Sequence, residues 1–244
     1  AILLDRVDPR VRYPEQISRD MGLPILGAVP HLRAKEPSEV VEALRGVRLN
    51  IIHEHGPAQP LLVTITSPGP GDGKTFLSSN LALAFADGGH RTLLIDGDIR
   101  RGLLHRRFKA NRQPGLADYL MGDATVDQIV QQTMYPRLTV IGCGTRTQRA
   151  PEVLGSPSME QLLNEMRPQY DVILVDSPPL TAGVDPFVLA TLTGTLIVVL
   201  RTGHSNRQIA GAKLEVLERM PIRLLGAVLN DVPRGAAYGY YAYY

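Results

Sequence analysis

The chain has 244 residues, of which 44% are hydrophobic and 20% charged, as in an ordinary globular protein with one large domain plus an arm or tail. A net charge of +2 argues against a nucleic-acid partner, and the single cysteine, Cys143, excludes a disulfide framework or an all-cysteine metal site within one chain. No apolar stretch reaches the roughly 18 residues of a membrane-spanning helix. The chain opens without Met, and we expect it to be a piece of a longer protein.

The predicted elements begin with an arm. Residues 1–36 are rich in Pro, Gly and charge, and they predict an irregular segment with one short strand near residues 23–29. A helix follows over residues 38–55, where apolar residues recur with helical spacing. Strands and helices then alternate, with strands expected at 61–66, 91–96, 138–142, 171–176, 195–200 and 222–229, and helices at 75–86, 157–167 and 205–219.

This alternation predicts an α/β fold with a doubly wound, mostly parallel sheet that helices cover on both faces. We assign residues 1–36 to the arm, 37–234 to the main domain and 235–244 to a tail. The tail holds five of the nine tyrosines and no charge, which indicates a low-complexity segment.

Residues 67–75, Ser-Pro-Gly-Pro-Gly-Asp-Gly-Lys-Thr, follow a predicted strand and precede a predicted helix, the setting of a phosphate-binding loop. Glycines let backbone N–H groups turn inward to cradle phosphates. Lys74 would reach the β and γ phosphates, and the Thr75 hydroxyl would bind Mg²⁺. The first glycine of the usual pattern is Pro68 here, and a Gly/Pro-rich turn is the alternative interpretation.

Three carboxylates follow predicted strands. Asp96 and Asp98 end or follow one strand, and Asp176 ends another, at the sheet edge where open α/β sheets bind ligands. Asp176 is placed as in a Walker B element, to hold Mg²⁺ directly or through water. Loop-capping aspartates are the alternative for the first pair.

The Asp96-x-Asp98-x-Arg100 motif and the run 176–179, Asp-Ser-Pro-Pro, resemble the deviant-Walker ATPases that include MinD and ParA. Gly69 stands where those proteins carry a signature Lys. The loop, the Asp96–Arg101 motif and residues 115–120, Gly-Leu-Ala-Asp-Tyr-Leu, resemble more closely the bacterial tyrosine kinases. The resemblance implies a MinD/ParA-like P-loop fold with ATP and Mg²⁺.

Site residues are carried over from this resemblance by position. It implies nucleotide binding by Gly71, Asp72, Gly73, Lys74, Thr75, Phe76, Arg201 and Asn230, and magnesium binding by Thr75, Asp98 and Asp176. Asp96 would accept the proton of the incoming tyrosine, with Lys74 and Asp98 as the other catalytic residues; the roles of Asp96 and Asp98 are open to reversal.

Two flanking features complete the resemblance. Glu42, Arg45 and Arg48 form E-x-x-R-x-x-R, which in this family mediates ring-shaped assembly; a solvated charged face is the alternative. The tail tyrosines would be the phosphate acceptors, against the alternative of an inert, sticky tail; they are Tyr238, Tyr240, Tyr241, Tyr243 and Tyr244.

Together these features predict an autokinase that phosphorylates its tail in trans within a ring homo-oligomer. An octamer is one possible size of this ring. The resemblance further implies a transmembrane polysaccharide co-polymerase part or partner, a protein-tyrosine phosphatase, and a place at the cytoplasmic face of the inner membrane in capsular or exopolysaccharide export. The alternatives are a MinD/ParA-like ATPase switch that positions a partner, and a nucleotide-binding scaffold.

Overall fold

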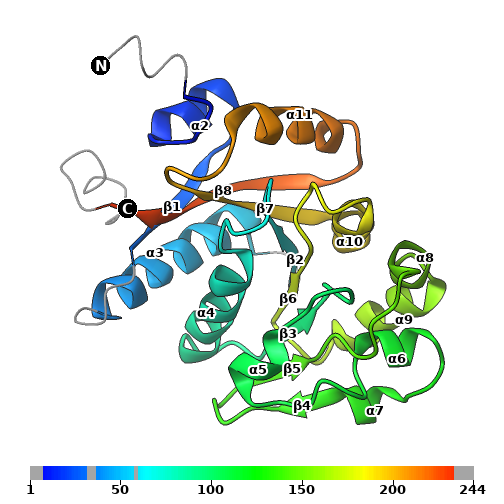
Figure 1. Ribbon diagram of the computed structural model, residues 1–244. Coiled ribbons are helices and arrows are strands. Elements are labelled where there is room, and N and C mark those ends of the chain that lie inside the picture. Colours follow the sequence, from blue (N-terminus) through cyan, green and yellow to red (C-terminus); the bar gives the residue numbers. More distant parts are fainter. Residues whose placement is uncertain (1–7, 32–36, 58–59, 234–244) are drawn as a thin grey trace.

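The computed structural model describes residues 8–31, 37–57 and 60–233. In this part of the chain, eight strands form one sheet in the order β1-β8-β7-β2-β6-β3-β5-β4 (Figure 1). All neighbouring strands are parallel except β4, which runs antiparallel to β5 at one edge. The strands are β1 (Ile25–Pro30), β2 (Leu61–Thr66), β3 (Thr92–Asp96), β4 (Val130–Gln132), β5 (Leu138–Ile141), β6 (Val172–Asp176), β7 (Thr195–Arg201) and β8 (Arg223–Val232).

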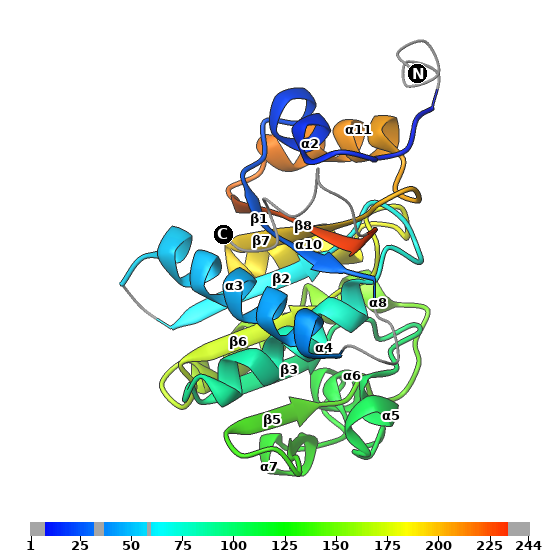
Figure 2. The same ribbon diagram turned by 90° about the vertical axis from the view of Figure 1, so that its left-hand side faces the viewer.

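Helices cover both faces of this sheet, which is the doubly wound architecture that the sequence predicts. Successive strand residues point to opposite faces, so that Val63 packs against α3 and α4 while Leu62 packs against the helices of the other face. Figure 2 shows α3 and α4 lying over one face. The helices are α2 (Pro14–Asp20), α3 (Pro37–His55), α4 (Lys74–Asp87), α5 (Leu104–Phe108), α6 (Leu116–Leu120), α7 (Val126–Ile129), α8 (Ala150–Leu154), α9 (Pro157–Met166), α10 (Asp185–Thr193) and α11 (Arg207–Glu218).

The first part of the chain is more regular than the sequence indicates. The short strand expected near residues 23–29 is present as β1, which pairs with β8 and so belongs to the main sheet. A seven-residue helix, α2, precedes it where the sequence predicts irregular structure. This helix begins with Pro14 and is too short for a helical period to be visible in the sequence.

The other end of the chain is described only to residue 233, so the predicted tail and its tyrosines lie outside the described residues. None of the described helices is both long and apolar enough to cross a membrane.

The sheet brings three loops together at one edge. In register, Ile65 of β2 and Asp96 of β3 both lie opposite Asp176 of β6. Because these strands are parallel, the segments that follow them leave the sheet on the same side. The predicted phosphate-binding loop and the predicted carboxylates therefore meet at the carboxyl ends of adjacent strands.

Candidate nucleotide-binding and catalytic site

The loop between β2 and α4 has the backbone of a phosphate cradle. Gly71 and Gly73 adopt positive φ angles of 84° and 95°, which place them in the left-handed region that favours glycine. A Cβ atom on Gly73 would lie 2.0 Å from Nδ2 of Asn230. Gly73 is also the N-cap of α4, whose first N–H groups have no partners within the helix. The loop therefore presents free donors at the positive end of a 14-residue helix.

The side chain of Asp72 in the loop itself, and side chains at and after the ends of β7 and β8, hold this cradle in place. The buried Asp72 carboxylate accepts hydrogen bonds from Gly69 N (2.9 Å) and from Ser205 Oγ (2.5 Å). Asn230 Nδ2 donates to the carbonyl of Asp72 (3.0 Å), and Arg201 Nη1 donates to the carbonyl of Gly71 (3.2 Å). Burial raises the pKa of Asp72, although the Ser205 hydrogen bond acts in the opposite direction.

These contacts give three predicted nucleotide-binding residues a clear location. Asp72 is part of the loop, and Arg201 and Asn230 donate hydrogen bonds to the loop's backbone carbonyls. Arg201 is also paired with Asp231 (2.8 Å). The Phe76 side chain packs against the core and lies under the guanidinium of Arg107, 5.6 Å from the ring centre. Phe76 therefore offers its backbone, in the first turn of α4, rather than its ring.

Lys74, Thr75, Asp98 and Asp176 meet in front of the loop. Thr75 Oγ1 donates to Asp176 Oδ2 (2.7 Å), and Lys74 Nζ lies 4.0 Å from Asp98 Oδ2. The other oxygen of Asp176 is buried and has no hydrogen-bond partner among the described residues. Burial raises the pKa of Asp176, while the ammonium of Lys74 acts to lower it. A hydroxyl beside an oxygen without a partner suits a hard cation such as Mg²⁺, so these residues fit the predicted ion.

The two aspartates of the Asp96-x-Asp98 motif have different environments. Asp98 lines the pocket, where its Oδ1 accepts a hydrogen bond from Arg101 N (2.9 Å). Asp96 is completely buried behind Gly102, where a Cβ atom would lie 2.4 Å from the Asp96 carboxylate oxygens. Burial raises the pKa of Asp96 well above its usual range, and the nearby Asp176 adds to this.

The open space in front of these residues is a pocket of about 590 Å³. Arg100 reaches its wall and is oriented by the buried Asp185 at the start of α10 (Nε–Oδ2 2.7 Å). The pocket joins the loop, the carboxylates and the segment after β6; its lining is Pro70, Gly71, Lys74, Thr75, Asp98, Arg100, Arg101, Gly102, Leu103, Asp176, Pro178, Pro179, Thr181 and Ala182.

Comparisons with known proteins assign this arrangement to a family. Residues 62–214 match a family model described as an AAA domain. The chain is 34% identical to the tyrosine-protein kinase ptk of Acinetobacter johnsonii over 93% of the chain and 31% of that protein. It is 32% identical to the tyrosine-protein kinase YwqD of Bacillus subtilis over 82% of the chain and 85% of that protein. The chain belongs to the bacterial tyrosine kinases.

Solved structures agree with this family and with the predicted fold. The kinase domain of the Escherichia coli tyrosine kinase Etk matches this chain with a TM-score of 0.86 at 29% identity, covering 93% of the chain and 96% of that domain. MinD from Pyrococcus horikoshii shares the fold alone, with a TM-score of 0.61 at 23% identity over 72% of the chain and 74% of MinD. The predicted family and fold are confirmed. The chain spans about a third of the length of relatives such as ptk.

The predicted assembly motif on α3 is divided between two environments. Glu42 and Arg45 are exposed and form an ion pair with each other. Arg48 turns toward α4, where its Nη1 donates to the carbonyl of Ala84 (2.7 Å). The first two side chains are therefore available to a neighbouring molecule, whereas Arg48 connects two helices of its own subunit.

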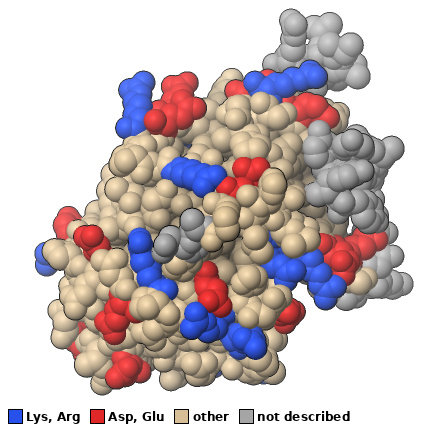
Figure 3. Space-filling model, turned by 180° about the vertical axis from the view of Figure 1, so that it is seen from behind, with Lys and Arg blue, Asp and Glu red and all other residues tan. Residues whose placement is uncertain are grey.

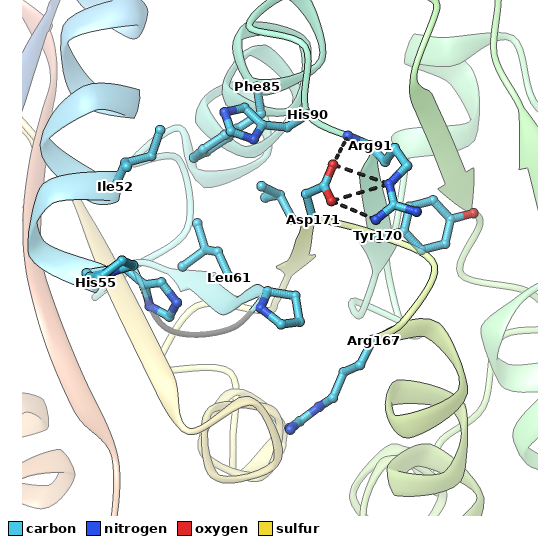
Figure 4. A pocket seen from close by; sticks show the side chains of 13 residues that line it. Ile52, His55, Leu61, Phe85, His90, Arg91, Arg167, Tyr170 and Asp171 are labelled. Atoms are coloured by element: carbon cyan, nitrogen blue, oxygen red, sulfur yellow. Dashed lines mark hydrogen bonds and ion pairs between the residues drawn. The ribbon is translucent and has the colours of Figure 1, made fainter.

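A second pocket, of about 460 Å³, lies at the opposite edge of the sheet, where β2, β3 and β6 begin (Figure 4). Arg91 and Asp171 form an ion pair beside it (Nη2–Oδ1 2.7 Å), and this pair joins the segments that lead into β3 and β6. None of the predicted site residues lines this pocket.

On the face shown in Figure 3, acidic and basic side chains are interspersed rather than gathered in a single basic stripe.

Proposed function

We propose that this kinase domain transfers the γ-phosphoryl group of ATP to tyrosines of its own C-terminal tail. The observation that carries the proposal is the convergence of Lys74, Thr75, Asp98 and Asp176 on one pocket at the N-terminus of α4. This is the set of groups that phosphoryl transfer requires: a cation at the β and γ phosphates, a magnesium site and a carboxylate for the acceptor hydroxyl.

Nucleotide binding would use the backbone of residues 69–74, with Lys74 neutralising charge on the β and γ phosphates. Thr75, Asp98 and Asp176 would hold Mg²⁺ directly or through water, and the ion would withdraw charge from the phosphate oxygens. Asp72, Arg201 and Asn230 would act from behind, by keeping the loop in its binding conformation.

The location of the two motif aspartates supports Asp98, rather than Asp96, as the partner of the acceptor hydroxyl, in addition to its place beside Mg²⁺. Asp98 lines the pocket and is better placed than Asp96 to accept a hydrogen bond from an incoming tyrosine hydroxyl. With an ordinary tyrosine pKa near 10, such a carboxylate chiefly orients the hydroxyl. Asp96 would instead support the segment around Gly102 from within the core.

We propose that transfer occurs in trans, within a ring of subunits joined in part through Glu42 and Arg45. A tail attached to the same domain as the phosphate-binding loop would have to bend back to enter the pocket of its own subunit. Each phosphate adds about −1.5 to −2 charges to a tail, so phosphorylation of neighbouring tails would favour dissociation of the ring. An octamer is one of the ring sizes that this proposal includes.

The cellular setting follows from the family. We propose that this domain belongs to a longer protein or complex with a transmembrane polysaccharide co-polymerase part, at the cytoplasmic face of the inner membrane. There it would regulate capsular or exopolysaccharide export, and a protein-tyrosine phosphatase would return the tails to their starting state.

Intact-mass spectrometry of mixed subunits tests the proposal. One subunit carries Lys74→Met with its tail intact, and the other has an intact site but Phe at all five tail tyrosines, so that their masses differ. After incubation with ATP and Mg²⁺, phosphate on the tail of the Lys74→Met subunit supports transfer in trans. If the unmodified chain phosphorylates its tail when incubated by itself, but the Lys74→Met tail stays unphosphorylated in the mixture, transfer occurs in cis. ATP hydrolysis with no phosphorylated tyrosine would favour the ATPase switch.

A further inference from the structure

Behind the pocket, three side chains with different donor atoms face one another. Asp96 ends β3, His105 lies on the short helix α5, and Cys143 follows β5. One carboxylate oxygen, one imidazole nitrogen and the thiol sulfur all lie within 4.8 Å of one another. Asp96 and Cys143 are completely buried, and His105 is partly exposed.

Two donor atoms of this cluster lack hydrogen-bond partners among the described residues. Oδ1 of Asp96 and Nδ1 of His105 are buried without a hydrogen-bond partner in the described part of the chain. The Cys143 sulfur lies 3.6 Å from the carbonyl of Gly102 and 3.8 Å from that of Gly144, and the side chain of Arg112 is a further hydrogen-bond partner of the thiol. Buried polar atoms without partners are costly, and two of them on side chains of one small cluster indicate a missing ligand.

We propose that Asp96, His105 and Cys143 form a binding site for Zn²⁺. A carboxylate oxygen, an imidazole nitrogen and a thiolate are the ligands that this ion takes in proteins, and water would complete the tetrahedron from the partly exposed side of His105. The thiol and the Asp96 carboxyl both release their protons to solvent on binding, and the resulting thiolate and carboxylate balance the charge of the ion.

The geometry requires a modest contraction. Ligand atoms around a tetrahedral Zn²⁺ at 2.0–2.3 Å are about 3.3–3.8 Å apart, so the widest separation of 4.8 Å has to close by about 1–1.5 Å. His105 is the ligand that can move, because it lies on a five-residue helix at the surface, whereas Asp96 and Cys143 are fixed at the ends of adjacent sheet strands.

Such a site would act on the kinase. Gly102, whose carbonyl contacts Cys143, lines the nucleotide pocket, and Asp96 lies in register with Asp176. Zn²⁺ bound here would fix Asp96 and the segment around Gly102, and we expect it to lower phosphoryl transfer while Mg²⁺ is present in excess. This consequence rests on the proposed kinase function, whereas the binding itself does not.

Cobalt absorption tests the site without any enzymatic readout. The purified chain is titrated with Co²⁺ in the absence of nucleotide and Mg²⁺, and then with Zn²⁺ to displace the cobalt. We expect one equivalent of Co²⁺ to give the d–d bands of a tetrahedral site and a thiolate-to-cobalt charge-transfer band. Absence of these bands, or more than one equivalent bound with no thiolate band, would overturn the proposal.

Variants assign the ligands. Cys143→Ala should abolish the charge-transfer band, and both Cys143→Ala and His105→Gln should weaken Zn²⁺ binding by about 100-fold or more, since even outer partners of metal ligands contribute about 10–100-fold. His90→Gln, outside the cluster, is the matched control and should bind as the unmodified chain does. Thermal melts establish that each variant is folded. If Cys143→Ala does not fold, the Zn²⁺ affinity of His105→Gln decides whether the site exists. An affinity equal to that of the unmodified chain would refute the site.

A second readout addresses regulation. Zn²⁺ at micromolar concentrations should reduce tail phosphorylation by the unmodified chain and leave that by Cys143→Ala unchanged. Equal inhibition of both would refute regulation through this cluster. If the chain proves inactive as a kinase, the cobalt spectra still decide whether the site exists.

Discussion

Replacing Arg48 with Ala removes a hydrogen bond that joins α3 to the last turn of α4. The donor is charged and the bond is partly buried, so its loss should lower the free energy of unfolding by about 1.5–3 kcal/mol. For a chain of this size, that corresponds to a decrease in melting temperature of roughly 3–12 °C. Arg45→Ala is the matched control from the same motif. Because Arg45 is exposed and pairs only with the exposed Glu42 in the described structure, its loss should cost less than about 1 kcal/mol.

Gly88 allows a stricter test of the same contact. A Cβ atom at position 88 would lie 2.0 Å from Nη1 of Arg48, and the backbone at Gly88 has an ordinary φ of −74°. Gly88→Ala should therefore displace the guanidinium and reproduce part of the loss caused by Arg48→Ala. In the double variant the clash with the guanidinium is absent and only the 3.2 Å approach of Cβ to the Phe85 carbonyl remains, so adding Gly88→Ala to Arg48→Ala should cost much less than adding it to the unmodified chain.

The assay is urea denaturation of the dilute chain, followed by circular dichroism, with sedimentation at the same concentration to establish that only monomer is present. Additive losses in the double variant would contradict the contact. Equal losses in the Arg45 and Arg48 variants would refute the division of the motif into an exposed pair and an internal residue.

Three further predictions concern the site. Gly73→Ala should weaken ATP binding more than tenfold in calorimetry, because Cβ would meet Asn230, whereas Gly203→Ala, also at positive φ but facing open space, should leave ATP affinity unchanged. Thr75→Val should abolish the gain in ADP affinity that Mg²⁺ provides while leaving ADP binding in EDTA intact; an unchanged magnesium effect would exclude Thr75 as a ligand of the ion. Burial raises the pKa of Asp96, so the folded chain holds a proton that the unfolded chain loses near pH 3.9, and stability falls as pH rises through this window. Thermal melts in EDTA therefore should show no gain in melting temperature for Asp96→Asn over the unmodified chain below about pH 3.9, and a gain that grows toward higher pH. A gain that does not change with pH would refute the raised pKa of Asp96 as its cause.

The strands and the phosphate-binding loop were predictable because their signals are local. Runs such as residues 172–175 are apolar throughout, as expected for strands buried on both faces, and glycine spacing marks the loop. Helix α2 and strand β4 were not predicted, because seven residues and three residues, respectively, are too few to show a period. Asp185 and Ser205 were missed as supporting residues because they lie far along the chain from the groups they contact.

The predictions for the motif on α3 and for the Asp96-x-Asp98 motif were limited because residue spacing does not show which way each side chain faces. Each step of three residues turns by about 60° around an α-helix, so Arg48 lies about 120° from Glu42, far enough to face α4 instead of solvent. Asp96 and Asp98 would share a face in a continuing strand, but β3 ends at Asp96 and the chain turns there. Asp98 consequently enters the pocket while Asp96 remains in the core. The roles of these residues, and of the tail tyrosines, stay predictions.

The pairing of β1 with β8 has a consequence for how the chain folds. Ile25 lies opposite Ala227, about 200 positions later, whereas Thr92 of β3 lies opposite Leu138 of β5. Closing the longer loop costs about 1.3 kcal/mol more in chain entropy. We therefore expect the central strands to associate first and β1 to add last, which hydrogen exchange during refolding would detect as late protection of its amides. Because α3 packs on β1, the helix that carries Glu42 and Arg45 would reach its final position only at this last step, after the nucleotide site has formed.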